Sequence, residues 1–341
     1  MLTRQKELSD LICCSYQNWY EDFRKNSIKS FVLAIPRDVL EYLKQDLFVL
    51  PVECTPAGGS SSSASFVGEK IDFDDDDTED VGAPEFREFS KVISETIEKL
   101  GGSVFIKTNW HSPKDSIWIT AGQTLRVNDL TDVYQLLKAS TICKEDLKQV
   151  EKEDFYQLVL KKWKEIHPGT EFRCFVRNRN LFAISPRDWP AYHEHFKTQK
   201  QDIIKDIVSL FKEKIKEKFP IDNYCFDVIR NTKDHVTLMD FSPFNEKYTS
   251  ALAFEWSQLN SDDLIRTDDE DQDDPEFRYL ASDVGIQPNS RNNYGIPHEV
   301  INMFKASSTD DNDELNEEQL ANMSRLVIDQ LQDETRHQDG N

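Results

Sequence analysis

The chain has 341 residues, 38% of them hydrophobic, and a formal net charge of −22 at pH 7. This length provides a core for one large domain or two smaller lobes. The net charge excludes direct binding to nucleic acid or to an anionic membrane surface unless a basic patch overrides it. No stretch approaches the roughly 20 apolar residues of a membrane-spanning helix, and the six scattered cysteines form no CxxC pair. These features predict a reduced protein of the cytosol or nucleus.

Acidic and polar segments divide the chain. DFDDDDTED, from Asp72 to Asp80, follows a serine-rich run, and DDEDQDDPE spans 268–276. Segments this charged cannot bury enough apolar surface to order themselves. We therefore predict a disordered acidic and serine-rich insert at 55–82, an acidic linker and C-terminal segment at 261–305, and a mostly disordered polar tail at 306–341.

The segments between these breaks predict a mixture of helices and antiparallel strands. Helical patterns occupy 85–102, 129–140 and 199–219, and strand patterns occupy 103–107, 117–120 and 155–163. Two hairpins follow from the patterns of 171–185 and 226–244. No Rossmann or P-loop glycine motif is present. The order of elements indicates an α+β fold instead of a regular βαβ alternation.

Two aspartates occupy the apolar strands of the second hairpin. If FDVIR pairs with VTLMDF across the loop TKDH, Asp227 lies directly opposite Asp240. Like charges in that position destabilise a sheet, and a magnesium ion bound by hard oxygen ligands would remove the conflict. Ser242 lies on the same strand face as Asp240 and offers a further oxygen. The alternative is that the aspartates cap turns or pair with Arg230 or Lys247.

Basic residues also occur inside apolar strands or at their ends: Lys107, Lys161, Lys162, Arg173 and Arg187. Each one alone is typical of a surface charge or a salt-bridge partner. Together with the two aspartates, they predict a pocket for a triphosphate. In contrast, His193 and His195 have no cysteine or third histidine near them in the sequence, which favours two polar side chains on a helix start or loop over a metal site.

Six blocks resemble the cell division cycle protein 123 family over about residues 11–256. They are NWYEDFRKNSIKSFVLAIP, the acidic insert with APEF, LGGSVFIKTNWHSPKDSIWI, LVLKKW, PGTEFRCFVRNRNLFAISPRD and FDVIRNTKDHVTLMDFSPF. The resemblance implies an ATP-grasp-like α+β fold in which two lobes with antiparallel sheets clasp Mg-ATP. It places 1–54 and 83–153 in the first lobe, the latter as its nucleotide-contacting region, and 154–260 in the second.

The resemblance also implies roles for individual residues. Lys107 matches a phosphate-contacting lysine, Lys114 and Ser116 match a loop that closes over the nucleotide, and Leu160, Lys161, Lys162 and Trp163 match the hinge that meets adenine. Arg173 and Arg187 match basic residues on the phosphate side, with Asp188 orienting Arg187 or a ribose hydroxyl. Asp227, Asp240 and Ser242 match ATP-binding residues on the metal side. The sequence departs from the family pattern at four positions: Ser242 replaces an asparagine, Ile106 a proline, Lys114 an arginine and Ser116 an alanine.

The function implied is that of a cytoplasmic assembly chaperone without a catalytic residue. Family members bind the gamma subunit of eukaryotic translation initiation factor 2 and promote its joining with the alpha and beta subunits. The chain is expected to bind ATP and Mg²⁺ and to be a monomer before it meets this partner, with no direct contact to nucleic acid or membrane. The alternatives are an ATP-grasp ligase that activates a carboxylate as an acyl-phosphate for attack by an amine, and an adaptor that uses its acidic segments and has a vestigial nucleotide site.

Overall fold

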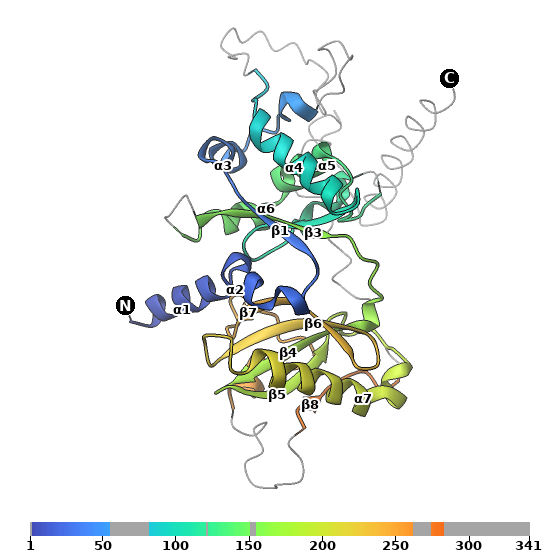
Figure 1. Ribbon diagram of the computed structural model, residues 1–341. Coiled ribbons are helices and arrows are strands. Elements are labelled where there is room, and N and C mark those ends of the chain that lie inside the picture. The colour runs from blue at the N-terminus through green and yellow to red at the C-terminus, as the bar shows by residue number, and fades with distance from the viewer. Residues whose placement is uncertain (1, 55–81, 121, 151–154, 262–273, 283–341) are drawn as a thin grey trace, which may run out of the picture.

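The computed structural model describes residues 2–54, 82–120, 122–150, 155–261 and 274–282, which form two lobes (Figure 1). The predicted insert at 55–82 lies outside these residues except for Gly82, and so does the tail at 306–341. Of the segment 261–305, only Ser261 and 274–282 are described. Within the described part of the chain, no helix is both long and apolar enough to cross a membrane.

The smaller lobe packs helices against one face of a three-stranded antiparallel sheet. The strands are β1 (Ser30–Ala34), β2 (Val104–Lys107) and β3 (Gln157–Lys162), in the order β1-β3-β2. The helices are α3 (Arg37–Lys44), α4 (Arg87–Lys99), α5 (Leu130–Ala139) and α6 (Thr141–Asp146), with short helical turns η2 (Val52–Cys54) and η3 (Lys114–Ile119). The turn η1 (Arg24–Asn26), which precedes β1, packs against the larger lobe. Leu158 and Leu160 of β3 are buried in the core shared with these helices. Because side chains alternate along a strand, Val159 and Lys161 face the other lobe.

The larger lobe contains a five-stranded sheet of order β7-β6-β4-β5-β8. Its strands are β4 (Glu171–Arg177), β5 (Asn180–Pro186), β6 (Tyr224–Thr232), β7 (His235–Pro243) and β8 (Glu276–Phe277), of which β8 runs parallel to β5. The helical elements are η5 (Pro168–Thr170), α7 (His195–Leu210), the π-helical turn η6 (Phe211–Ile215) and α8 (Trp256–Asn260). Phe172 and Phe226 pack with α7 in one core, which leaves Arg173 and Asp227 on the opposite face of the sheet.

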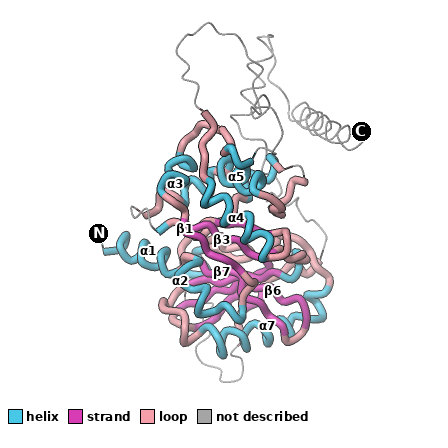
Figure 2. The backbone as a smooth tube through the Cα atoms, turned by 45° about the horizontal axis from the view of Figure 1, so that its top comes forward, coloured by secondary structure: helices cyan, strands magenta, loops and turns pink. Residues whose placement is uncertain are grey.

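Two N-terminal helices, α1 (Leu2–Cys13) and α2 (Tyr16–Phe23), connect the lobes. Trp19 and Phe23 pack against Phe241 of β7, with ring centroids 5.2 and 5.3 Å away. On the other side, the amide of Tyr16 donates to the carbonyl of Asn109, which follows β2, at 2.9 Å. Figures 1 and 2 show this segment between the strand layers of the two lobes. Although 1–54 was predicted to belong to the first lobe, α2 also packs into the core of the second.

The α+β arrangement of two lobes is confirmed, with two local differences from the predicted elements. Residues 117–120 were predicted as a strand, but 117–119 belong to the short helix η3 and Thr120 caps its end. Asp115 fixes this helix by accepting hydrogen bonds from the hydroxyl of Ser140 and the amide of Ile142, which outweighs the local alternation. In addition, β3, which falls in the range 154–260 predicted for the second lobe, is the middle strand of the smaller sheet.

The predicted pairing of Asp227 with Asp240 is confirmed, but the hairpin around it differs from a simple one. The pairing shifts by a bulge after Asp227, and the strands continue to Thr232 and His235. The predicted loop of four residues is therefore reduced to the turn at Lys233 and Asp234. Asp234 has a φ of 60°, the left-handed conformation that an aspartate tolerates in a turn.

Candidate functional site

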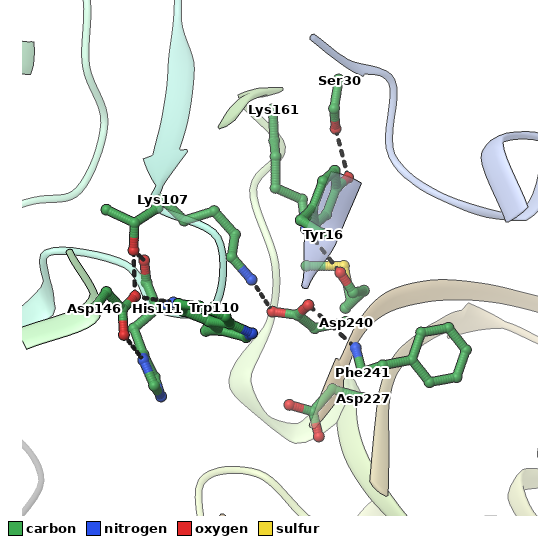
Figure 3. Close-up of polar contacts among 12 residues, drawn as sticks. Tyr16, Ser30, Lys107, Trp110, His111, Asp146, Lys161, Asp227, Asp240 and Phe241 are labelled. Atoms are coloured by element: carbon green, nitrogen blue, oxygen red, sulfur yellow. Dashed lines mark hydrogen bonds and ion pairs between the residues drawn. The ribbon is translucent and has the colours of Figure 1, made fainter. Parts of the chain in front are cut away.

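Six charged side chains meet between the facing sheets, and we call them the interlobe cluster. Lys107 and Lys161 come from the smaller lobe, and the larger lobe contributes Arg173, Arg187, Asp227 and Asp240. Figure 3 shows both lysines and both aspartates converging on this region from opposite sides. Four basic residues thus surround two carboxylates, although the chain as a whole is strongly acidic.

Asp227 is held by two arginines. The Nε and Nη2 atoms of Arg173 each donate to one carboxylate oxygen at 2.8 Å, a bidentate pair in which both side chains are largely buried. Arg187 adds a second contact, with its Nη1 3.3 Å from Oδ2. Burial alone would raise the pKa of Asp227, but the charges of Arg173 and Arg187 outweigh it and lower the pKa below its usual value. Asp227 therefore stays ionised.

Asp240 forms the direct ionic link between the lobes. It accepts a hydrogen bond from the ammonium of Lys107, whose side chain is 3% exposed, while that of Asp240 is 23% exposed. Its other oxygen accepts from the amide of Phe241 at 3.1 Å. Beside this pair, Lys161 donates to the carbonyl of Met239 at 2.8 Å. Lys107 and Lys161 of the smaller sheet therefore both hold strand β7 of the larger lobe.

Lys161 is poised to change its charge. Burial lowers the pKa of its ammonium to about 8, with Asp240 opposing the change and Lys107 adding to it. A lysine in this state gains a full charge when an anion comes near. The four basic side chains of the interlobe cluster therefore carry more positive charge than its two aspartates can neutralise.

Tyr16, which the sequence analysis did not select, lies between the two lysines. The ammonium groups of Lys107 and Lys161 are 5.3 and 5.0 Å from the centroid of its ring. Its hydroxyl is 2.8 Å from that of Ser30 on β1. An aromatic face stabilises nearby cations, so Tyr16 positions both lysines. No spacing signal in the sequence could reveal it, because Lys107 and Lys161 come much later in the chain.

The sequence analysis also missed a set of hydrogen bonds between Asp146 and the loop that directly follows Lys107. The buried carboxylate of Asp146 accepts from the hydroxyl of Thr108, from the amide of His111 at 2.9 Å and from the ring Nδ1 of His111 at 2.6 Å. Figure 3 shows this group beside Lys107. Asp146 therefore fixes the loop that follows β2 and with it the end of the strand that carries Lys107. The only sequence signal for these hydrogen bonds is the polar segment 108–111 itself, which could have been interpreted as a capping segment.

The oxygen donors fit magnesium only if phosphate supplies further ligands. Asp227 uses both oxygens for Arg173, whereas Asp240 is partly exposed and lies on the same strand face as Ser242. Among the described residues there is no group of three histidine, cysteine, aspartate or glutamate side chains spaced to hold a metal ion. Magnesium needs only one or two carboxylates when phosphates and waters complete its octahedron. Asp240 and Ser242, with Asp227 next to them, are therefore the residues that would hold it.

The remaining predicted residues lie around the interlobe cluster at different depths. The Ser116 hydroxyl is buried in the smaller lobe, where it donates to the carbonyls of Pro113 and Leu136, and Lys114 is exposed at the start of η3. The Leu160 side chain lies in the core. The amides of Lys162 and Trp163 donate to the carbonyls of Lys29 and Ser103. Among the predicted residues, the six of the interlobe cluster therefore lie together. The side chains of Ser116 and Leu160 lie apart from them, inside the smaller lobe.

Asp188 is held at the edge of the cluster. Both of its oxygens lie within hydrogen-bonding distance of the His193 Nε2, at 2.9 and 3.1 Å. Glu171, which the sequence analysis also missed, lies on the strand face of Arg173. Its pKa is raised mainly by burial, while Arg187 and Lys161 counteract the increase. These two carboxylates extend the charged surface beyond Arg187.

Comparison with known proteins places the chain in a family. Residues 19–304 match the family described as D123. The chain belongs to the D123 family. This D123 chain is 38% identical over 303 residues to a Xenopus tropicalis protein named translation initiation factor eIF2 assembly protein, covering 85% of this chain and 90% of that one. It is 36% identical over 257 residues to the cell division cycle protein 123 of Yarrowia lipolytica, covering 73% and 67% of the two chains.

A solved structure agrees with this D123 assignment. Cdc123 from Schizosaccharomyces pombe superposes with a TM-score of 0.62 and 30% sequence identity, covering 81% of this chain and 98% of that one. The resemblance noted in the sequence is thereby confirmed. So is the predicted α+β class, with two lobes whose antiparallel strands face each other.

Proposed function

We propose that this chain is an ATP- and magnesium-binding assembly factor for eukaryotic translation initiation factor 2, acting in the cytoplasm. The relatives that cover most of the chain bear the name of an eIF2 assembly protein, which supports the assembly role. The partner in this proposal is the gamma subunit, whose joining with the alpha and beta subunits the chain promotes.

One observation carries the nucleotide part of the proposal: four basic side chains from two lobes surround two carboxylates in a largely buried site. Without a ligand, Lys107 and Lys161 bond to Asp240 and to the carbonyl of Met239. A triphosphate would give these ammonium groups stronger partners, and Asp240 would be released to hold magnesium. Arg187 is more exposed than Arg173, at 35% against 7%, and is the arginine better placed to turn toward a phosphate.

Binding would also affect how the lobes are held together. The contact of Lys107 with Asp240 joins β2 to β7, so a nucleotide that separates this pair must itself bridge the lobes. The residues of the interlobe cluster would then position the phosphates and a metal ion. None of them is assigned the role of nucleophile or general base. The proposal therefore expects ATP to stabilise one arrangement of the lobes for docking, with little turnover in the absence of the partner.

The experiment is a binding assay with purified gamma subunit, using wild-type protein, Asp240→Asn and a matched control. ATP affinity is measured by calorimetry with magnesium, and capture of the gamma subunit is measured with and without ATP. We expect Asp240→Asn to weaken magnesium-dependent ATP binding at least about tenfold, or about 1.4 kcal/mol, and to reduce capture in parallel. Asp222→Asn, an exposed aspartate paired with Arg179 at 2.6 Å, is the control.

The outcomes separate the parts of the proposal. Failure of the wild-type protein to capture the gamma subunit would reject the partner. Normal capture by a variant that no longer binds ATP would remove the nucleotide from the assembly step. Steady ADP release with a small carboxylate and an amine, without any protein partner, would favour the ligase alternative.

A further inference from the structure

A polar cavity lies on the other face of the larger sheet, away from the interlobe cluster. Its volume is about 200 Å³, and it is bounded by η5, the first half of α7 and the end of β6. We call it the α7 cavity. Its polar lining residues are His167, Thr170, His195, Gln199, Arg230 and Asn231. Since a water molecule takes about 30 Å³, the space is large enough for an ion of phosphate size.

Every charged or titratable residue that lines the α7 cavity is basic or neutral. Arg230 is buried and contributes a guanidinium, while His167 and His195 contribute imidazoles. None of the lining residues is acidic, and the first turn of α7 contains no acidic residue either. The positive end of the α7 dipole lies at His195, so the helix also favours a negative ligand there.

The donors are fixed before any ligand arrives. Arg230 donates from Nε to Asp206 at 2.7 Å and from Nη1 to Gln199 at 3.1 Å, and the side chains of Arg230 and Asp206 are 6% and 3% exposed. His195 Nε2 lies 3.1 Å from the carbonyl of Gly169, and the amide of Gly169 donates to Nδ1 of His167 at 3.2 Å. A planar guanidinium held in this way is well suited to an oxyanion.

The histidines here are not arranged as a metal site. His167, which is distant from His193 and His195 in the sequence, becomes their neighbour, with ring centroids of His167 and His193 5.9 Å apart. Yet no set of three metal-binding side chains occurs in the part of the chain that the structure describes. Moreover, His193 is already directed at Asp188.

We propose that the α7 cavity is a binding site for a phosphoryl group, either free phosphate or the phosphate of a modified protein segment. The guanidinium of Arg230 and the imidazoles of His167 and His195 surround the ligand, with the amides of Gln199 and Asn231 as neutral donors. This proposal does not depend on ATP binding at the interlobe cluster.

The proposed site has a defined pH dependence. Burial lowers the pKa of His195, and the neighbouring His193, His167 and Arg230 lower it further, whereas the carbonyl of Gly169 opposes this change. Of the nearby carboxylates, Asp188 and Asp206 are engaged with His193 and Arg230, and Glu194, the N-cap residue of α7, is exposed and makes no capping hydrogen bond. His195 is therefore neutral at pH 7 without a ligand, and a bound anion favours its protonated form. Binding takes up a proton, so affinity falls as the pH rises, by at most about tenfold per pH unit for one proton.

The test uses the full chain with isotope-labelled histidines and follows each ring by NMR. Inorganic phosphate is titrated at constant ionic strength against chloride, and a phosphoserine with blocked ends is titrated in the same way. Sulfate, whose charge is constant between pH 6 and 8, is used for the pH dependence. His111 lies beside the interlobe cluster, so its ring reports phosphate that binds there instead.

We expect saturable shifts of the His167 and His195 rings with phosphate and tighter sulfate binding at pH 6.5 than at pH 7.5. His195→Asn should weaken the response of the His167 ring about tenfold, whereas His235→Asn, at the exposed β6–β7 turn, should leave it unchanged. Tighter binding of phosphoserine would identify a modified segment as the source, and preference for inorganic phosphate would identify the free ion. Shifts no larger than those with chloride, or a full His167 response in folded His195→Asn protein, would overturn the proposal.

Discussion

At the residue scale, the chemistry of the interlobe cluster depends on how each charge is buried. Arg173 and Asp227 form a closed bidentate pair, whereas Lys161 donates to the carbonyl of Met239 and has a pKa lowered to about 8 by burial. The two kinds of residue should therefore respond differently to a ligand. Arg173 keeps its partner, and Lys161 changes its protonation.

We predict that ATP binding is accompanied by proton uptake at Lys161. Near pH 8 the free protein carries about half a proton on this side chain, and a bound phosphate drives it to the fully charged form. Calorimetry in two buffers with different heats of ionisation measures the uptake. Lys161→Arg removes the titration while keeping the charge, so an equal uptake in this variant would show that another group is responsible.

A second residue-scale prediction concerns Gly169, where a side chain has no room. A Cβ at this position would lie 2.6 Å from Nδ1 of His193. Gly169→Ala must therefore displace the His193 ring and weaken its contact with Asp188. We expect a loss of about 1–3 kcal/mol in the free energy of unfolding, measured by denaturation. Gly82→Ala is the matched control because no atom of the described residues lies within 4 Å of the position that a Cβ would take there. Equal stability of the two variants would contradict this account.

At the element scale, the sequence predicted most strands and their faces but not the contacts between distant elements. The alternation in β6 and β7 was sufficient to place Asp227 opposite Asp240, because the pattern of buried residues restricts the register of a hairpin. Residues 117–120 have a strand pattern, but hydrogen bonds from Ser140 and Ile142 to Asp115 hold 117–119 in η3. Such long-range bonds leave no periodic signal.

The same limitation applies to the candidate site. The four basic residues of the interlobe cluster were selected because each interrupts or ends an apolar strand. Such a local signal can be recognised from a single sequence. Tyr16 and Asp146 act through partners far away in the chain, and both were missed. Ser116 was selected through the resemblance alone, and its hydroxyl is used for packing inside the smaller lobe.

A prediction at the element scale concerns the end of helix α3, which a lysine from α5 completes. The buried ammonium of Lys138 donates to the carbonyls of Tyr42 and Gln45 and lies 4.2 Å from the Tyr42 ring centroid. Lys138→Met would leave both carbonyls without this donor and should cost about 1–3 kcal/mol of stability. Chemical denaturation measures the loss. Lys99→Met, an exposed lysine paired with Glu95, should cost far less, and similar losses would refute the capping role.

At the scale of the whole molecule, the contact of Lys107 with Asp240 joins the two lobes. We predict strong coupling in a double-mutant cycle of Lys107→Met and Asp240→Asn. Each single substitution leaves a charge in a site of low exposure without its partner, and the double substitution removes both. The interaction energy from unfolding measurements should be about 0.5–3 kcal/mol. The exposed pair Lys99 and Glu95 serves as the reference, and additive effects at the interlobe pair would mean that it does not hold the lobes together.

The position of Tyr16 has a consequence for how the protein folds during its synthesis on the ribosome. Its ring contacts lysines at 107 and 161, while the carboxylates that complete the cluster lie at 227 and 240. During synthesis, the smaller sheet cannot close until β3 has left the ribosome, because β3 is its middle strand. Even then Lys107 and Lys161 lack Asp240 and the carbonyl of Met239 until β7 follows. A chain interrupted before residue 239 therefore has neither of these contacts, and the interlobe cluster is complete only near the end of the described fold.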